Sequence, residues 1–222
     1  MGKLWLKVCG ITRMEDALLA CELGYNAVGM IFAESPRRVS AERAKNISAA
    51  LPSSVLRVGV FAGIATEEVG RLAEYCGLDL IQFHGGEGPE EVLRFGARAI
   101  VALRPRFLGD LARMDEYPGI FAVLLDTWDA ALRGGTGRTG DWDLAASAAR
   151  CGRVILAGGL HPRNVGEALA KVKPFGVDVS SGVEAAPGIK DGVLMKEFAR
   201  VAREARRALV EEGFSDASDR RG

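Results

Sequence analysis

Short apolar runs and amphipathic stretches alternate eight times along this chain, and no other feature limits its possible folds as strongly. The apolar runs are rich in Val, Ile and Leu, which is typical of strands that are buried on both faces of a parallel sheet. The expected strands are residues 4–9, 27–32, 55–61, 79–83, 97–103, 120–126, 153–158 and 175–180. The expected helices lie near residues 14–23, 41–50, 67–76, 89–96, 108–115, 142–150, 163–172 and 191–210.

Eight strand–helix units within 222 residues fit a closed barrel better than an open sheet. The hydrophobic share of 48% is enough for a large core, and no Pro- or Ser-rich linker divides the chain. The sequence therefore predicts the α/β class and a single (β/α)8 TIM barrel with a parallel eight-stranded sheet over residues 1–210. Residues 211–222 are polar and are expected to form a frayed C-terminal tail.

The composition argues against several classes of partner. Lys+Arg and Asp+Glu both total 29, so nothing favours nucleic acid or a membrane surface. No apolar run approaches the roughly 20 residues of a membrane helix, and no secretory signal is evident, so a cytoplasmic location is expected. The cysteines are far apart and form no CxxC pair, so no zinc-like metal site is expected.

Polar residues recur on one face of the expected strands. Side chains alternate between the two faces of a strand, so odd and even positions separate into two sets. The polar set, on the face opposite the apolar neighbours, comprises Lys7, Cys9, Gln82, His84, Asp126 and Asp178. If the apolar set packs under the helices, the polar set faces the barrel interior and the carboxyl-end mouth, where barrels place their chemistry.

Each of these residues also has a purely structural alternative. Cys9 could pack as a small apolar residue, and Asp126 could cap a turn or a helix. Asp178 could close a buried pair with Lys7, to which a structural role is assigned. Several polar groups at successive strand ends nevertheless favour a functional site, because buried charge is costly unless it has a use.

Glycine-rich segments predict an anion site at the same end of the barrel. They are GGTG (134–137), AGGL (157–160) and SSGVE (180–184). Glycines let backbone N–H groups approach an anion closely, and barrels often bind phosphate at the loops after strands 7 and 8. Two such segments at adjacent strand ends predict a phosphate site.

The motifs of the chain, in their order, resemble those of the phosphoribosylanthranilate isomerase family. They are KVCGIT (7–12), EDAL (15–18), SPRRVS (35–40), RVGVF (57–61), QFHG (82–85), LLDT (124–127), GGTG (134–137), LAGGLHPRNV (156–165), VDVSSGVE (177–184) and PGIKD (187–191). The resemblance implies the Amadori rearrangement of N-(5-phosphoribosyl)anthranilate to 1-(2-carboxyphenylamino)-1-deoxyribulose 5-phosphate, in tryptophan biosynthesis. No cofactor is implied.

The resemblance also implies roles for individual residues. Cys9 resembles the general base and Asp126 the general acid, and Arg37, or its neighbour Arg38, resembles the arginine that holds the anthranilate carboxylate. Further substrate contacts are implied for Gln82, His84, Gly135, Thr136, Gly137, Gly158, Gly159, Asp178, Ser180, Ser181 and Gly182. Such a reaction leads us to expect a raised pKa for Asp126 and a lowered pKa for Cys9.

The chain departs from the family pattern in places, and alternatives remain. A polar residue is missing after Phe61, and the loop at residues 32–39 is about one residue shorter than usual. Another phosphoribosyl-sugar isomerase on the same barrel is one alternative, although an aspartate would be expected there in place of Cys9. A non-catalytic binder of a phosphorylated ligand is the other. Both a monomer and a homodimer are compatible with the sequence.

Overall fold

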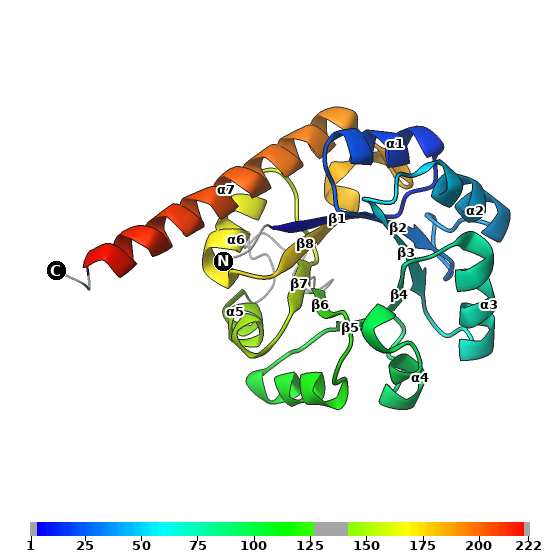
Figure 1. The fold of residues 1–222 in the computed structure, drawn as a ribbon, viewed down its shortest axis with the longest axis horizontal. Helices are drawn as coiled ribbons and strands as arrows, with labels where there is room; N and C mark the ends of the chain where they lie inside the picture. Colours follow the sequence, from blue (N-terminus) through cyan, green and yellow to red (C-terminus); the bar gives the residue numbers. More distant parts are fainter. Residues whose placement is uncertain (1–3, 127–141, 220–222) are drawn as a thin grey trace.

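The strands close into a barrel (Figure 1) in this computed structural model, which describes residues 4–126 and 142–219, without the side chains of 212–219. Each strand pairs in parallel with the next along the chain, and the eighth pairs with the first. The barrel strands are β1 (Trp5–Cys9), β2 (Ala27–Ile31), β3 (Leu56–Phe61), β4 (Leu80–Phe83), β5 (Ala99–Leu103), β6 (Ala122–Asp126), β7 (Val154–Ala157) and β8 (Gly176–Val179). The predicted barrel is confirmed.

The helices form a ring outside the strands (Figure 1). The α-helices are α1 (Met14–Glu22), α2 (Ala41–Ala50), α3 (Thr66–Cys76), α4 (Pro89–Leu93), α5 (Trp142–Cys151), α6 (Val165–Val172) and α7 (Gly192–Asp219). The 3-10 helices are η1 (Gly96–Arg98), η2 (Leu108–Glu116) and η4 (Ser181–Val183). A short antiparallel hairpin of β9 (Glu184–Ala186) and β10 (Ile189–Lys190), which was not predicted, follows the barrel.

Two separate hydrophobic cores result from the alternation of side chains along the strands. The larger core lies between strands and helices and includes Leu6, Val8 and Phe83. The smaller core fills the barrel interior, with residues such as Val58, Leu80, Ile100, Leu124 and Ile155. Because Lys7 and Cys9 alternate with Leu6 and Val8, they face the interior, as their positions in the sequence predict.

An aromatic cluster closes the amino end of the barrel. Trp5 stacks on Phe175 with 6.0 Å between ring centroids, and Phe121 lies 5.7 Å from Trp5. The guanidinium of Arg153 covers both phenylalanine rings, 4.0 Å from the Phe175 centroid and 4.5 Å from that of Phe121. Such cation–π contacts stabilise a cluster whose outer edge meets solvent.

The segment expected as a helix at 108–115 is the 3-10 helix η2 instead. Its apolar residues Leu111 and Met114, followed by the buried Tyr117, recur at every third position. A 3-10 helix has about three residues per turn, so this spacing aligns them on one face toward the core.

The last helix differs from the prediction in length. α7 runs to Asp219, so most of the segment 211–222 continues the helix rather than forming a frayed tail. Extending an existing helix adds one backbone hydrogen bond per residue, which needs no buried face. Figure 1 shows α7 projecting past the ring of helices.

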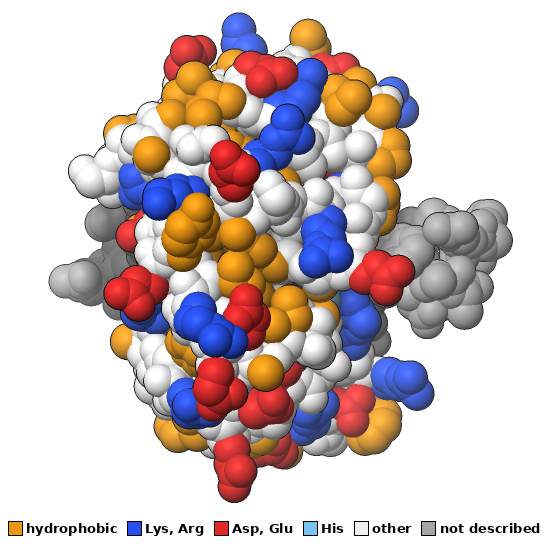
Figure 2. Space-filling model, turned by 90° about the vertical axis from the view of Figure 1, so that its right-hand side faces the viewer, with side chains coloured by type: hydrophobic (Ala, Val, Ile, Leu, Met, Phe, Trp, Pro, Cys, Tyr) orange, Lys and Arg blue, Asp and Glu red, His pale blue; other side chains and the backbone are white. Residues whose placement is uncertain are grey.

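On the side of α2 and α3, the surface mixes both signs of charge. Figure 2 shows Lys and Arg side chains interspersed with Asp and Glu on that face, with small apolar areas between them. The solvent-facing sides of these outer helices are thus ordinary polar surface. Among the residues that the structure describes, no helix has both the length and the apolar character of a membrane span.

Candidate active site

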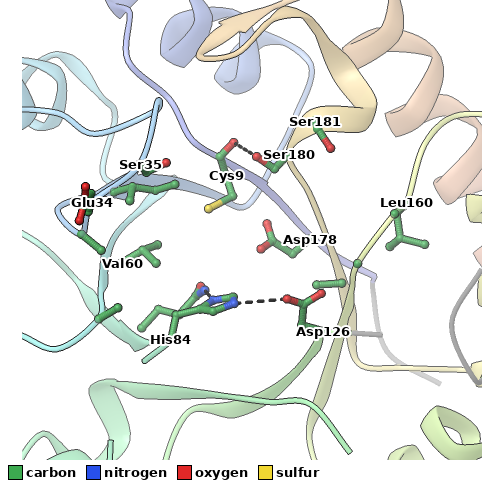
Figure 3. A pocket seen from close by; sticks show the side chains of 17 residues that line it. Cys9, Glu34, Ser35, Val60, His84, Asp126, Leu160, Asp178, Ser180 and Ser181 are labelled. Atoms are coloured by element: carbon green, nitrogen blue, oxygen red, sulfur yellow. Dashed lines mark hydrogen bonds and ion pairs between the residues drawn. The ribbon is translucent and has the colours of Figure 1, made fainter. Parts of the chain in front are cut away.

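A pocket of about 380 Å³ opens at the carboxyl ends of the strands (Figure 3). Its lining includes many of the residues predicted from the sequence, namely Cys9, Gln82, His84, Asp126, Gly158, Gly159, Asp178, Ser180 and Ser181. Gly182 and Arg37 lie outside this lining, and Gly135, Thr136 and Gly137 lie outside the described residues. Cys9 and Asp126 point into the pocket from different sides in Figure 3.

A buried ion pair lies beneath the Cys9 thiol. Lys7 and Asp178 are register partners on the adjacent strands β1 and β8, and their Nζ and Oδ2 atoms are 2.8 Å apart. The Lys7 side chain has no exposed surface. The structural alternative for this pair is therefore confirmed. The second carboxylate oxygen of Asp178 is also buried and has no hydrogen-bond partner among the residues described.

Cys9 lies where burial dominates its ionisation. Desolvation raises the pKa of the thiol, and Asp178 raises it further, while Lys7 and Lys190 lower it. The net direction is a pKa above the ordinary value, so the expected lowering is wrong. The two lysine charges reduce the effect of burial without reversing it.

Asp126 belongs to a row of polar side chains at the pocket, in the order Gln82, His84, Asp126 and Arg104. The Gln82 amide nitrogen lies 3.1 Å from Nδ1 of His84, and Nε2 of His84 lies 3.4 Å from Oδ2 of Asp126. If Gln82 donates to Nδ1, the ring proton is on Nε2 and faces the carboxylate. Arg104 Nε donates to the same oxygen at 3.1 Å.

These neighbours decide the ionisation of Asp126. Burial by itself raises the pKa of the carboxyl, but the His84 hydrogen bond and the Arg104 charge outweigh it. The pKa of Asp126 is therefore lowered below its ordinary value, and the expected raising is wrong. These neighbours therefore favour the carboxylate over the protonated form.

The loops after β7 and β8 pack tightly together at the predicted phosphate site. A Cβ atom on Gly182 would overlap the carbonyl oxygen of Leu160, so only glycine allows this approach. Ser180 is fixed by its hydroxyl, which donates to the Cys9 carbonyl at 3.1 Å (Figure 3). Lys190 Nζ donates to the Ser180 carbonyl at 3.2 Å.

The two arginines after β2 point in different directions. The Arg37 guanidinium donates to Glu184 through Nε and Nη2, at 2.9 and 2.6 Å. Glu184 also accepts from Lys190 at 2.7 Å. Arg37 is half-buried beside the pocket, whereas Arg38 is exposed. Of the two candidates, Arg37 therefore has the fixed position.

The sequence analysis did not predict how three charged residues contribute to the electrostatics of this site. Arg104 follows directly after β5, at a strand end like the other candidates, but the apolar pattern of this strand is too weak to mark its end in the sequence. Lys190 belongs to the PGIKD motif and had no assigned role. Lys7 was placed on the correct face, but its contact with Cys9 was not anticipated.

The described ranges, 4–126 and 142–219, contain no group of three or more His, Cys, Asp or Glu side chains arranged to hold a metal ion.

Comparisons with known proteins agree with this arrangement. The family described as "N-(5'phosphoribosyl)anthranilate (PRA) isomerase" matches residues 6–201. A relative from Rubrobacter xylanophilus, named N-(5'-phosphoribosyl)anthranilate isomerase, is 50% identical over 202 residues, which cover 89% of this chain and 98% of the relative.

Solved structures give the same result. The phosphoribosylanthranilate isomerase of Thermotoga maritima superposes with a TM-score of 0.82 at 41% identity, over 90% of this chain and 99% of that chain. A phosphoribosylanthranilate isomerase in complex with reduced 1-(o-carboxyphenylamino)-1-deoxyribulose 5-phosphate superposes with a TM-score of 0.80 at 39% identity, with the same coverage of both chains. Fold and sequence agree along nearly the whole barrel, and the chain belongs to the N-(5'-phosphoribosyl)anthranilate isomerase family, whose enzymes act in tryptophan biosynthesis.

Proposed function

We propose that the chain catalyses the Amadori rearrangement of N-(5-phosphoribosyl)anthranilate, with Cys9 as the general base and Asp126 as the general acid. The observation that carries this proposal is the placement of a thiol and a carboxyl on different sides of one pocket whose rim includes the glycine and serine loops. A proton donor and a proton acceptor that both face the same substrate are what this isomerisation requires. The family relationship supports the same reaction.

In the proposed mechanism, each proton has a defined origin and destination. Protonated Asp126 donates to the ribose ring oxygen, the bond between C1 and that oxygen breaks, and the anthranilate nitrogen forms a Schiff base with C1. The Cys9 thiolate then removes the proton from C2, which gives an enolamine. Tautomerisation of the enolamine moves the C2 hydroxyl proton to C1 and gives the 2-keto product, and exchange with solvent returns a proton to Asp126 and removes the one on Cys9.

The directions of the pKa shifts make the reactive form of the free enzyme a minor one. Asp126 has to carry a proton although its pKa is lowered, and Cys9 has to lose one although its pKa is raised. Between the two pKa values, a rise in pH lowers the fraction of protonated Asp126 and raises the fraction of Cys9 thiolate by the same factor. The fraction of enzyme in the reactive form therefore stays constant. The kcat/KM value is therefore expected to be constant across this range and to fall on either side.

Two buried acceptors are suited to the hydroxyl groups of the sugar. Oδ1 of Asp178 and Oε1 of Gln82 are buried in residues that line the pocket, and neither has a hydrogen-bond partner in the described part of the chain. Buried acceptors without partners are rare and costly. Ribose hydroxyls would satisfy both, while the backbone near Gly159 and Ser181 would receive the phosphate.

Replacement of Arg37 tests the proposed carboxylate contact. Arg37→Ala is expected to raise KM about tenfold or more with a smaller change in kcat, because a charge-assisted hydrogen bond to the substrate is lost. Steady-state kinetics would measure it. Arg38→Ala is the matched control, since that side chain is exposed. A raised KM in Arg38→Ala alone would assign the contact to Arg38.

Replacement of Arg104 tests the origin of the lowered pKa of Asp126. Arg104→Met removes a positive charge from the carboxylate, so the pKa of Asp126 is expected to rise. Below the pKa of Asp126, this carboxyl is already protonated, and further acid only lowers the fraction of Cys9 thiolate. The value of kcat/KM therefore begins to fall at the pKa of Asp126, and this fall is the acid limb of the profile. The limb should move to higher pH in Arg104→Met and stay in place in the control Arg106→Met. An unmoved limb in Arg104→Met contradicts the assignment.

The reaction itself can be tested directly. Purified protein mixed with freshly made phosphoribosylanthranilate should accelerate the decay of substrate fluorescence. A decay no faster than the uncatalysed background would refute the proposal. If the ligand raises the melting temperature without turnover, the chain is a non-catalytic binder of the phosphorylated compound instead. The cytoplasmic location and the choice between monomer and homodimer stay predictions.

A further inference from the structure

Lys7 and Cys9 share one small space inside the barrel. They lie on the same face of β1, and Gly29 on β2 is the register partner of Cys9. A Cβ atom built on Gly29 would be 2.8 Å from Sγ of Cys9 and 3.1 Å from Nζ of Lys7. The missing side chain of Gly29 therefore provides the space in which the ammonium group and the thiol approach each other.

The ammonium group is fixed in this position. Asp178 takes one of its hydrogen bonds at 2.8 Å, and the side chain has no exposed surface. Burial disfavours the charged form, but Asp178 and Cys9 outweigh it and raise the pKa of Lys7 above its ordinary value. Lys7 is thus a cation with three protons to donate; Asp178 accepts one of them, and the thiol lies beside the ammonium group in the space next to Gly29.

We propose that Lys7 is a positioning residue for the isomerisation: its ammonium group, held against Cys9 in the space left by Gly29, stabilises the thiolate that acts as the base. The thiol proton leaves to solvent through the open pocket, and Lys7 keeps its own protons throughout. The inference rests on the proposed role of Cys9. It assigns to Lys7 a role in the reaction, stabilisation of the Cys9 thiolate, in addition to its buried ion pair with Asp178.

Other charged groups around the thiol act in both directions. Those that face it or its neighbours are Lys7 on β1, Asp178 on β8, Lys190 on β10, Arg37 after β2, and His84 after β4, which acts on Asp178. Lys190 and Arg37 are already paired with Glu184, at 2.7 and 2.6 Å. Lys7 has the largest influence among the cations on the Cys9 thiol.

The test compares two variants that differ only at Lys7. Asp178→Asn keeps the lysine, and the double variant Lys7→Met/Asp178→Asn removes it without leaving a carboxylate buried and unpaired. The readout is the pH dependence of Cys9 alkylation by iodoacetamide, measured by mass spectrometry of the Cys9 peptide in the absence of substrate. Circular dichroism checks that each variant is folded.

The two variants should differ in their alkylation midpoints, because only one of them keeps the Lys7 cation beside the thiol. Asp178→Asn removes an anion, so its midpoint should lie below that of the wild type. The double variant should lie about one pH unit or more above Asp178→Asn, as expected for loss of a cation at this range. Lys196→Met, an exposed lysine on α7, should leave the profile unchanged.

The inference would be overturned if removal of Lys7 left the midpoint unchanged both from the wild type to Lys7→Met and from Asp178→Asn to the double variant, because a merely structural lysine would not move the thiol titration. Lys7→Met alone, where it folds, should raise the midpoint above the wild-type value. Since no substrate is present, this result is independent of the fluorescence assay. If the wild-type protein shows no turnover but the Lys7 variants still shift the alkylation midpoint, the proposed function is refuted and the effect of Lys7 on the thiol is retained.

Discussion

Cys9→Ser is expected to lower kcat by about a hundredfold or more, the usual contribution of a general base. A serine hydroxyl is a far weaker acid than a thiol, so the side chain stays protonated at every accessible pH and cannot remove the C2 proton. Cys9 is buried in the pocket wall, but the change from sulfur to oxygen removes little volume, so the fold should be unaffected. Steady-state assays of substrate fluorescence would measure the loss.

Two features make this result specific to the chemistry. Cys151→Ser is the matched control, because that thiol is exposed at the end of α5 and should be neutral for turnover. KM should change little in Cys9→Ser, since the proposed phosphate and carboxylate contacts are retained. Turnover close to the wild-type value in Cys9→Ser would remove Cys9 from the mechanism.

Asp126→Asn is expected to lower kcat by a similar factor, about a hundredfold or more. Asparagine keeps the shape and can still contact His84 and Arg104, but it has no acidic proton for the ribose ring oxygen. Ring opening should therefore become the slow step, while affinity for a product analogue stays near that of the wild type. Steady-state kinetics and calorimetric titration separate the two effects.

A surface variant provides the comparison. Asp143→Asn alters an exposed carboxylate on α5 that pairs with Lys171 and does not line the pocket, so it tests the loss of an aspartate charge outside the site. It should change neither kcat nor ligand affinity. If Asp126→Asn turns over as fast as the wild type, another group supplies the proton, and His84 would be the next candidate because it lines the same pocket.

The barrel could be predicted because its signals are local. Each strand is a continuous apolar run, and alternation along it assigns Leu6 and Lys7 to opposite faces without knowledge of any neighbour. The exceptions have local causes as well. At 108–116 the three-residue spacing of apolar side chains produced a 3-10 helix where an α-helix was expected.

The electrostatics could not be predicted in the same way. The direction of the Asp126 shift depends on Arg104 and His84, which come from other strand ends and meet the carboxylate only in the closed barrel. The Cys9 shift depends on how completely the fold removes water from the thiol. The position of Lys7 in the strand also does not predict its proximity to the thiol. Its long side chain extends along β1 to the level of Cys9, two residues further on.

The aromatic cluster at the amino end has a consequence for how ligands move. Trp5, Phe121 and Phe175 close that end beneath Arg153, and the barrel interior above them is packed with side chains. Among the described residues, the pocket is thus closed toward the amino end and open at the carboxyl ends of the strands, so we expect the product to leave by the path along which the next substrate enters. Substrate and product then exclude each other, so accumulated product slows the enzyme as a competitor for entry.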